Sequence, residues 1–83
     1  MSKTLKDDVV IVTGASRGIG AATALELAAR GAKVVLAARS LKPIQTLAQS
    51  IHSQNGQALA IACDVADYQA VENVVKGALE HFG

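Results

Sequence analysis

Apolar and polar positions follow two different periods along this chain of 83 residues. Short apolar runs predict three strands, over about 9–13, 33–38 and 58–63. After each run, apolar residues recur at helical spacing instead. They predict a helix over about 18–30, a second helix after Ser40 and a third after Asp67. The chain therefore divides into three units, each a strand followed by a helix.

The expected helices carry apolar stripes and recognisable ends. Ser40 and Asp67 are residue types that cap helix N-termini, and Pro43 fits a first turn, where few N–H bonds are lost. Gly31 and the Asn55-Gly56 pair suit helix ends. The second stripe consists of Leu41, Ile44, Leu47, Ala48 and Ile51, and the third of Val71, Val74, Val75, Ala78, Leu79 and Phe82. We expect both stripes to pack against a sheet.

Strands that alternate with helices imply an α/β fold, in which right-handed crossovers build a parallel sheet. We expect three parallel strands in the order 3-2-1, as in the first half of a doubly wound, Rossmann-like sheet. In that fold the first strand is central, whereas here it would lie at an edge. Val9–Val12 has neither the charge nor the proline that protects an edge. This suggests that residues 1–83 are a half-domain of something longer.

Composition excludes several classes of function. The formal net charge is +1 and no Lys or Arg cluster points to nucleic acid. No apolar run approaches the roughly 18 residues of a membrane span. Cys63 is the only cysteine, so we expect a small buried hydrophobe in a reducing cytoplasm, and no cysteine metal cluster. We interpret His52 and His81 as solvated helix residues and the acidic pair at 7–8 as a solvated N-terminus.

The most specific segment of the sequence is Thr13–Gly20, which reads TGASRGIG. Its glycines, Gly14, Gly18 and Gly20, follow a strand and open into an alanine-rich helix. Such a turn brings bare backbone against a phosphate, and the helix N-terminus faces the anion. The G-K-[ST] ending of a P-loop is absent, which disfavours a nucleoside triphosphatase. A tight turn that binds no ligand is the alternative.

This string resembles the cofactor loop of the short-chain dehydrogenase/reductase family. Residues 32–39 (AKVVLAAR) look like the second strand of that family, residues 63–65 (CDV) like the end of its third strand, and residues 81–83 (HFG) like its lead-in to a fourth. The resemblance covers the chain from about residue 7. It implies an oxidoreductase that transfers hydride between a nicotinamide cofactor and a small-molecule carbonyl or alcohol substrate.

Two arginines bear on the choice of cofactor. A Rossmann unit that binds NAD carries an acid at the end of its second strand, where this chain has Ala38 followed by Arg39. Arg17 lies inside the glycine loop. Guanidinium groups suit a 2′-phosphate, so we expect NADP to be preferred over NAD. The alternative is that Arg17 and Arg39 are ordinary surface cations.

The resemblance also implies roles for other loop residues. Asp64 would accept a hydrogen bond from the adenine amino group, with the Val65 backbone nearby, although an Asp here can also simply cap a turn. Ser16 would form hydrogen bonds within the pyrophosphate loop. Ile19 would donate a backbone N–H and bury its side chain.

The catalytic residues of the family are not in this sequence. The family uses a Tyr-x-x-x-Lys pair, but Tyr68 is the single tyrosine and Glu72 stands four residues after it, so we expect Tyr68 to be structural. The 83 residues should bind cofactor and be inactive alone, as part of a longer single-domain enzyme that forms a homo-oligomer, a dimer or tetramer. A non-catalytic nucleotide-binding module and a truncated remnant are the alternatives.

Overall fold

The computed structural model describes residue 6, residues 8–15 and residues 18–83. Three strands alternate with three helices in this part of the chain, and their bounds lie close to those that the hydrophobic pattern predicts. The elements are β1 (Val9–Thr13), α1 (Gly18–Ala29), β2 (Lys33–Ala38), α2 (Leu41–Ser53), β3 (Gln57–Ala62) and α3 (Tyr68–Phe82).

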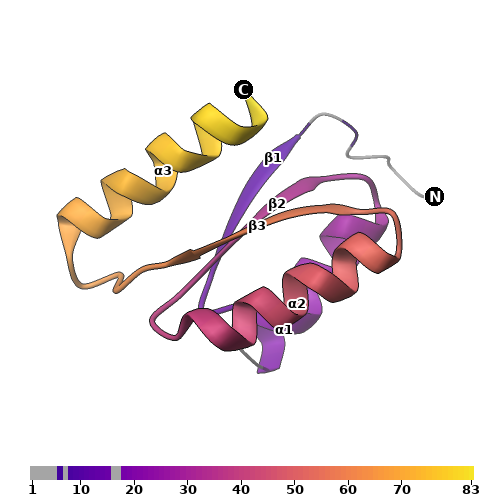
Figure 1. Ribbon diagram of the computed structural model, residues 1–83, viewed down its shortest axis with the longest axis horizontal. Helices are drawn as coiled ribbons and strands as arrows, with labels where there is room; N and C mark the ends of the chain where they lie inside the picture. Colours follow the sequence, from indigo (N-terminus) through magenta and orange to yellow (C-terminus); the bar gives the residue numbers. More distant parts are fainter. Residues whose placement is uncertain (1–5, 7, 16–17) are drawn as a thin grey trace.

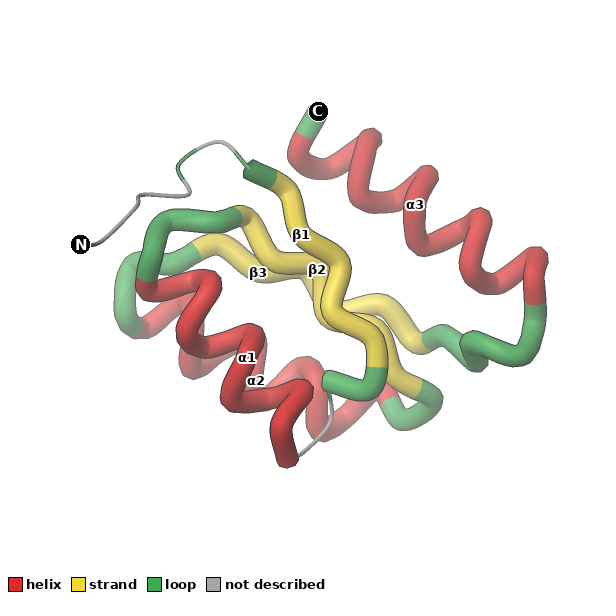
Figure 2. Tube along the Cα trace, turned by 180° about the vertical axis from the view of Figure 1, so that it is seen from behind, coloured by secondary structure: helices red, strands yellow, loops and turns green. Residues whose placement is uncertain are grey.

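The strands form one parallel sheet with β2 in the middle, in the order β1-β2-β3. Read from the other side, this is the predicted order 3-2-1, and the predicted α/β fold class is confirmed. α1 and α2 cover one face of the sheet and α3 crosses the other face (Figure 1). The view from behind shows the same three layers (Figure 2). β1 and β3 are therefore the two outer strands of the described sheet.

The alternation of side chains along β2 divides the core into two clusters. Val34, Leu36 and Ala38 face α1 and α2, where they join the larger cluster with Ile44 and Ile51. On the other face, under α3, a smaller cluster consists of Val35, Ala37, Cys63, Val74 and Ala78. Both faces of β2 are buried, as expected for a strand between two layers of helices.

The two predicted N-caps differ in the structure. The Asp67 carboxylate accepts hydrogen bonds from the backbone N–H groups of Gln69 and Ala70, at 3.0 and 3.4 Å. Ser40 occupies the N-cap position of α2, but its side chain makes no capping hydrogen bond. Asp67 is therefore confirmed as a cap, whereas Ser40 marks the start of α2 through its backbone alone.

The apolar stripe of α3 is only partly buried. Val74 and Ala78 face the sheet, but Val75 and Leu79 are 45% and 63% exposed. The predicted helix with an apolar stripe is present, but only part of the stripe is covered by the sheet. The reason is that, among the described elements, α3 packs only against the sheet and has no second helix beside it.

Two single residues complete the fold. Cys63 is buried under α3, as predicted. His52 is an exposed residue of α2, as predicted, and its Nε2 atom also lies 3.0 Å from the carbonyl oxygen of Ala58 in β3. The side chain of His52 thus joins α2 to the neighbouring strand.

In the described residues, no helix has both the length and the apolar character that crossing a membrane requires.

Candidate functional site

The candidate site lies where the three parallel strands end. Because the strands run the same way, the segments that follow them meet at one end of the sheet. Gly14 follows β1, Arg39 follows β2, and Asp64 lies just beyond β3. The fold thus brings to one end the loops that the sequence singled out. In open α/β sheets this end is where ligands bind.

The glycine loop needs glycine for two different reasons. Gly14 and Gly18 have φ angles of +65° and +63°, in the left-handed region that residues with a Cβ atom rarely adopt. Among the described residues, a Cβ atom added to either would meet nothing within 4 Å. The part of the loop that the structure describes therefore leaves room for a ligand at these two glycines.

Gly20, by contrast, is needed for close packing. A Cβ atom on Gly20 would collide with the carbonyl group of Gly14, with the carbonyl carbon at 2.9 Å. The first turn of α1 therefore lies directly against the loop that leaves β1. This contact fixes the N-terminus of α1 beside the loop, where its free N–H groups attract an anion. The first turn of α1 has no acidic residue to compete for that position.

Two of the predicted contacts in this loop, Ser16 and Arg17, lie outside the described residues. Ile19 is described, and the expectation that its side chain would be buried is wrong, since it is 85% exposed. The helical turn that points Gly20 at the Gly14 carbonyl directs the preceding side chain away from the sheet. A backbone role for Ile19 stays a prediction.

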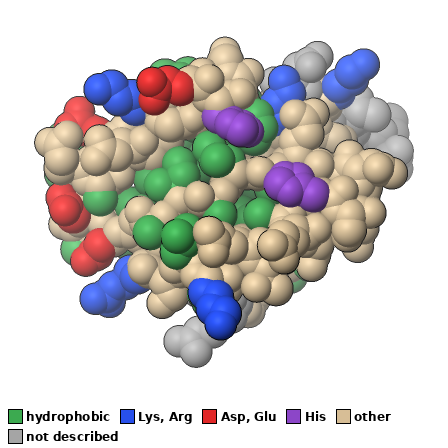
Figure 3. Space-filling model, in the orientation of Figure 1, with side chains coloured by type: hydrophobic (Ala, Val, Ile, Leu, Met, Phe, Trp, Pro, Cys, Tyr) green, Lys and Arg blue, Asp and Glu red, His purple; other side chains and the backbone are tan. Residues whose placement is uncertain are grey.

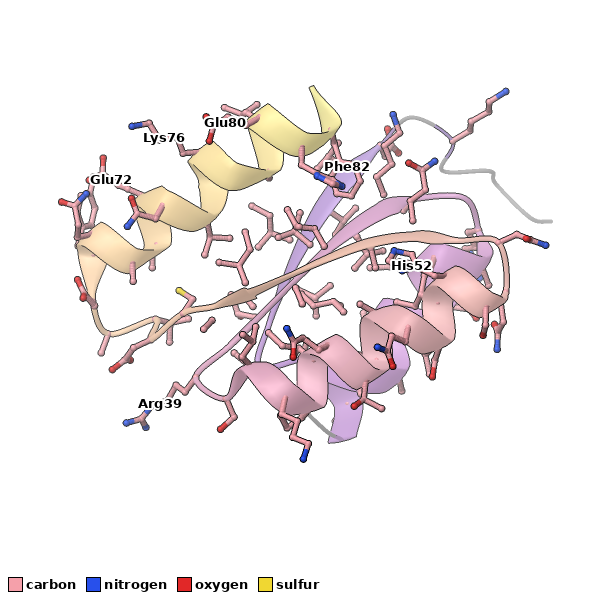
Figure 4. The ribbon with its side chains drawn as sticks, viewed as in Figure 1. Arg39, His52, Glu72, Lys76, Glu80 and Phe82 are labelled. Carbon is pink, nitrogen blue, oxygen red and sulfur yellow. The ribbon has the colours of Figure 1, made fainter. Side chains whose placement is uncertain are left out.

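The end of β2 carries a cation and no acid. Ala38 is 6% exposed and closes the strand. Arg39 follows at the surface, and its side chain extends away from the β2–α2 turn into solvent (Figure 4). A guanidinium group is therefore free to turn toward a ligand at this end of the sheet.

The end of β3 is shaped by Asp64. One carboxylate oxygen of Asp64 accepts a hydrogen bond from the N–H of Ala66 at 3.0 Å, and its carbonyl accepts one from Asp67. This is the turn-capping role that the sequence left open. The turn uses the Oδ1 atom of Asp64. A hydrogen bond from the adenine amino group to Asp64 stays a prediction. Val65, the next residue, is 58% exposed at the same edge.

Other chemistry-bearing side chains lie elsewhere. Tyr68 begins α3 and is 77% exposed, so it is not part of either core cluster, contrary to the expectation of a structural role. The described residues contain no group of three or more His, Cys, Asp or Glu side chains placed to hold a metal ion.

The family model described as short chain dehydrogenase matches residues 8–83. The chain belongs to the short-chain dehydrogenase family. Among curated relatives of this family, an uncharacterized oxidoreductase of Listeria monocytogenes is 44% identical over 80 residues, which are 96% of this chain and 32% of the relative. The versicolorin reductase of Emericella nidulans is 45% identical over 80 residues, 95% of this chain and 30% of that protein.

Solved structures of short-chain dehydrogenases share the fold. A citronellol catabolism dehydrogenase of Pseudomonas aeruginosa superposes with a TM-score of 0.91 at 36% identity, over 100% of this chain and 35% of the other. A metagenomic short-chain oxidoreductase in complex with NADP gives 0.90 at 40% identity, over 98% and 37%.

The chain spans about a third of the length of these relatives. Its membership of the short-chain dehydrogenase family, with the Rossmann-like fold, is established over nearly all of its own length. The activity of a whole enzyme is a separate matter, because most of the residues of such an enzyme lie outside these 83.

Proposed function

We propose that this chain is the part of an NADP-dependent short-chain oxidoreductase that holds the adenosine half of the cofactor. The observation that carries the proposal is the convergence of an open glycine loop, Arg39 and Asp64 at the carboxyl end of one parallel sheet. The pyrophosphate would lie over Gly14 and Gly18 at the N-terminus of α1. A relative of the same fold has been solved with NADP.

The residues present fit a 2′-phosphate better than a free ribose hydroxyl. NAD binding in a Rossmann unit uses an acidic residue at the end of the second strand. That place is taken by Ala38, which is buried and apolar, and the next side chain is the cation Arg39. Arg17, outside the described residues, would supply a second guanidinium group. Asp64 and the Val65 backbone would border the adenine.

Within a longer protein, the bound nicotinamide would exchange hydride with a carbonyl or alcohol carbon of a small-molecule substrate. The described residues contribute binding and orientation of the cofactor to this chemistry. We further propose that the complete protein works in the cytoplasm as a homo-oligomer. The 83 residues alone should show no steady NADPH-dependent turnover, and such turnover in the pure chain would overturn this part of the proposal.

The cofactor preference is tested by calorimetric titration of the chain with NADP and with NAD. Replacing Arg39 by alanine should weaken NADP binding about tenfold, because it removes one charge-assisted contact from an exposed site. Binding of NAD should change little. Arg30→Ala is the matched control, since Arg30 lies at the far end of α1, where it pairs with Glu26 at 3.1 Å. Equal affinity of the unaltered chain for both cofactors would refute the preference.

A nucleotide-binding module without catalysis is the second candidate. Within these 83 residues Tyr68 is followed four positions later by Glu72, so the features of this chain by themselves support nucleotide binding alone. The two candidates agree on nucleotide binding and differ on turnover. A reductase assay of the protein encoded by the whole reading frame, with NADPH and a panel of carbonyl compounds, separates them.

A further inference from the structure

The hydrogen bonds of β3 show which of its backbone groups face away from β2. The N–H of Cys63 donates to the carbonyl of Ala38 in β2 at 2.7 Å. In a parallel strand the backbone groups of successive residues point to opposite sides, so those of 57, 59, 61 and 63 face β2. The N–H and C=O groups of Ala58, Ala60 and Ala62 therefore face away from the sheet.

This edge lacks the common protections against pairing with another strand. Natural edge strands carry lysine, proline, a bulge or an inward charge. Gln57–Ala62 reads QALAIA, with no charge, no proline and small side chains at the outward-facing residues. By composition alone β3 would be an open template for a further strand.

One side chain does cover the edge. His52, in the last turn of α2, reaches from the helix to β3, and its Nε2–H donates to the carbonyl of Ala58 at 3.0 Å (Figure 4). Since a carbonyl can only accept, the bonded nitrogen carries the hydrogen. His52 also lines a groove along this edge together with Ala58, Leu59 and Ala60, with His81 of α3 at its other border. Both histidines of the chain appear on this face, with hydrophobic side chains between them (Figure 3).

We propose that His52 closes the outer edge of β3 against pairing with β3 of a second copy of this chain. The sequence of β3 indicates which partner His52 would exclude. Two identical uncharged strands can pair antiparallel about a two-fold axis, with Ala60 opposite Ala60 and Ala58 opposite Ala62. That pair would need the Ala58 carbonyl of both copies, the group that His52 already holds. In such a dimer, the imidazole of each of the two copies therefore opposes the pairing.

The protection remains useful in a longer chain. In the doubly wound strand order 3-2-1-4-5-6, the third strand is an outermost one and the first becomes central. The β3 edge therefore stays exposed whether or not further strands join β1. This inference rests on the sheet and on His52, and it is independent of which cofactor binds.

The test compares the unaltered chain with His52→Ala by sedimentation velocity and by hydrogen exchange of residues 57–62 over a range of protein concentrations. With two carbonyls released per dimer, self-association of His52→Ala should be at least about tenfold stronger. Exchange over β3 should slow as concentration rises. Loss of the α2–β3 contact alone would change exchange by the same amount at every concentration. An exchange rate of His52→Ala that is independent of concentration overturns the proposal.

Four further substitutions keep the test decisive. His52→Gln places an amide N–H near the position of Nε2 and should restore the behaviour of the unaltered chain, whereas His52→Asn is too short and should behave as His52→Ala. His81→Ala is the matched control on the same groove and should change nothing. Ala60→Pro is then added to His52→Ala or to His52→Asn. It removes the N–H of residue 60, which faces outward and makes no hydrogen bond to β2, and it should abolish the new association. Association that survives Ala60→Pro contradicts pairing through β3.

Discussion

The two edge strands of the sheet, β1 and β3, differ in how their outward backbone groups are protected. The difference indicates which edge is suited to pair with another strand. At β1, the N–H of Lys33 donates to the carbonyl of Asp8, so the backbone groups of Val9 and Ile11 face outward. These two residues are apolar and 41% and 37% exposed. At β3, the outward residues are alanines and the side chain of His52 holds one of their carbonyls.

An open apolar edge is a liability in a finished protein, whereas a guarded edge is a normal outer boundary. The short-chain dehydrogenases that match this chain are about three times as long, and the doubly wound strand order places another strand beside β1. β1 then corresponds to an interior strand and β3 to an outer one. The half-domain interpretation stays a prediction, and the contrast between the two edges agrees with it.

The largest effect is expected where β1 meets α1. Gly20→Ala would drive a Cβ atom into the Gly14 carbonyl, so we expect a loss of about 1–3 kcal/mol in unfolding free energy, with nucleotide binding abolished. Urea unfolding followed by circular dichroism measures the first, and calorimetry with NADP the second. Hydrogen exchange should accelerate over β1 and α1 more than over β3.

Gly77→Ala is the matched control for this substitution. A Cβ atom on Gly77, inside α3, would meet only the flexible end of Ile61 at 3.0 Å. Alanine is also favoured over glycine in a helix interior by about 1 kcal/mol. The stability of Gly77→Ala should therefore lie within about 1 kcal/mol of the unaltered chain. Equal losses in the two variants would show that the Gly20 contact is not special.

A proline on each edge tests the edges directly. Ile11→Pro removes the N–H of residue 11, which faces outward and makes no hydrogen bond to β2. It should weaken self-association of the chain about tenfold, as measured by sedimentation equilibrium. Ala60→Pro, the corresponding change on β3 in the unaltered background, should leave association as it was, since His52 already closes that edge. The opposite ranking of these two variants would reverse the assignment of the open edge.

The smallest effect concerns the helices that flank the edges. Asp67→Ala removes two hydrogen bonds to the first turn of α3 and should lower the unfolding free energy by about 1 kcal/mol. Ser40→Ala, at the same position of α2, removes a side chain without a capping bond and should cost close to nothing. Thermal unfolding of the two variants side by side gives the comparison. A larger loss from Ser40→Ala would contradict the described caps.

Local signals in the sequence were sufficient for most of the fold. The predicted ranges of the first two strands coincide with β1 and β2, and the third differs from β3 by one residue at each end. These strands are apolar on both faces or end at glycine-rich turns, and such features depend on neighbours in the sequence. The position of Asp67 at the start of α3 followed for the same reason.

Features that depend on tertiary geometry were not predicted. The bond from His52 to Ala58 requires the turn after α2 to bring β3 back beside the helix, and no pattern of residue types encodes that distance. The exposure of Ile19 and Leu79 depends on what lies beside them, whereas a periodic pattern records only which face is apolar. For the site, the sequence predicted the loops that meet, but the turn-forming bond of Asp64 emerged only from the structure.

Cys63 gives this protein a built-in chemical reporter. It is the only cysteine of the chain and lies 5% exposed beneath α3, in contact with Val74 and Ala78 of the smaller cluster. Movement of α3 away from the sheet would expose its sulfur to a thiol reagent in solution. The labelling rate of this native thiol therefore reports how often α3 separates from the sheet, and no engineered probe is needed. A ligand or a further segment that holds α3 against the sheet would lower the labelling rate.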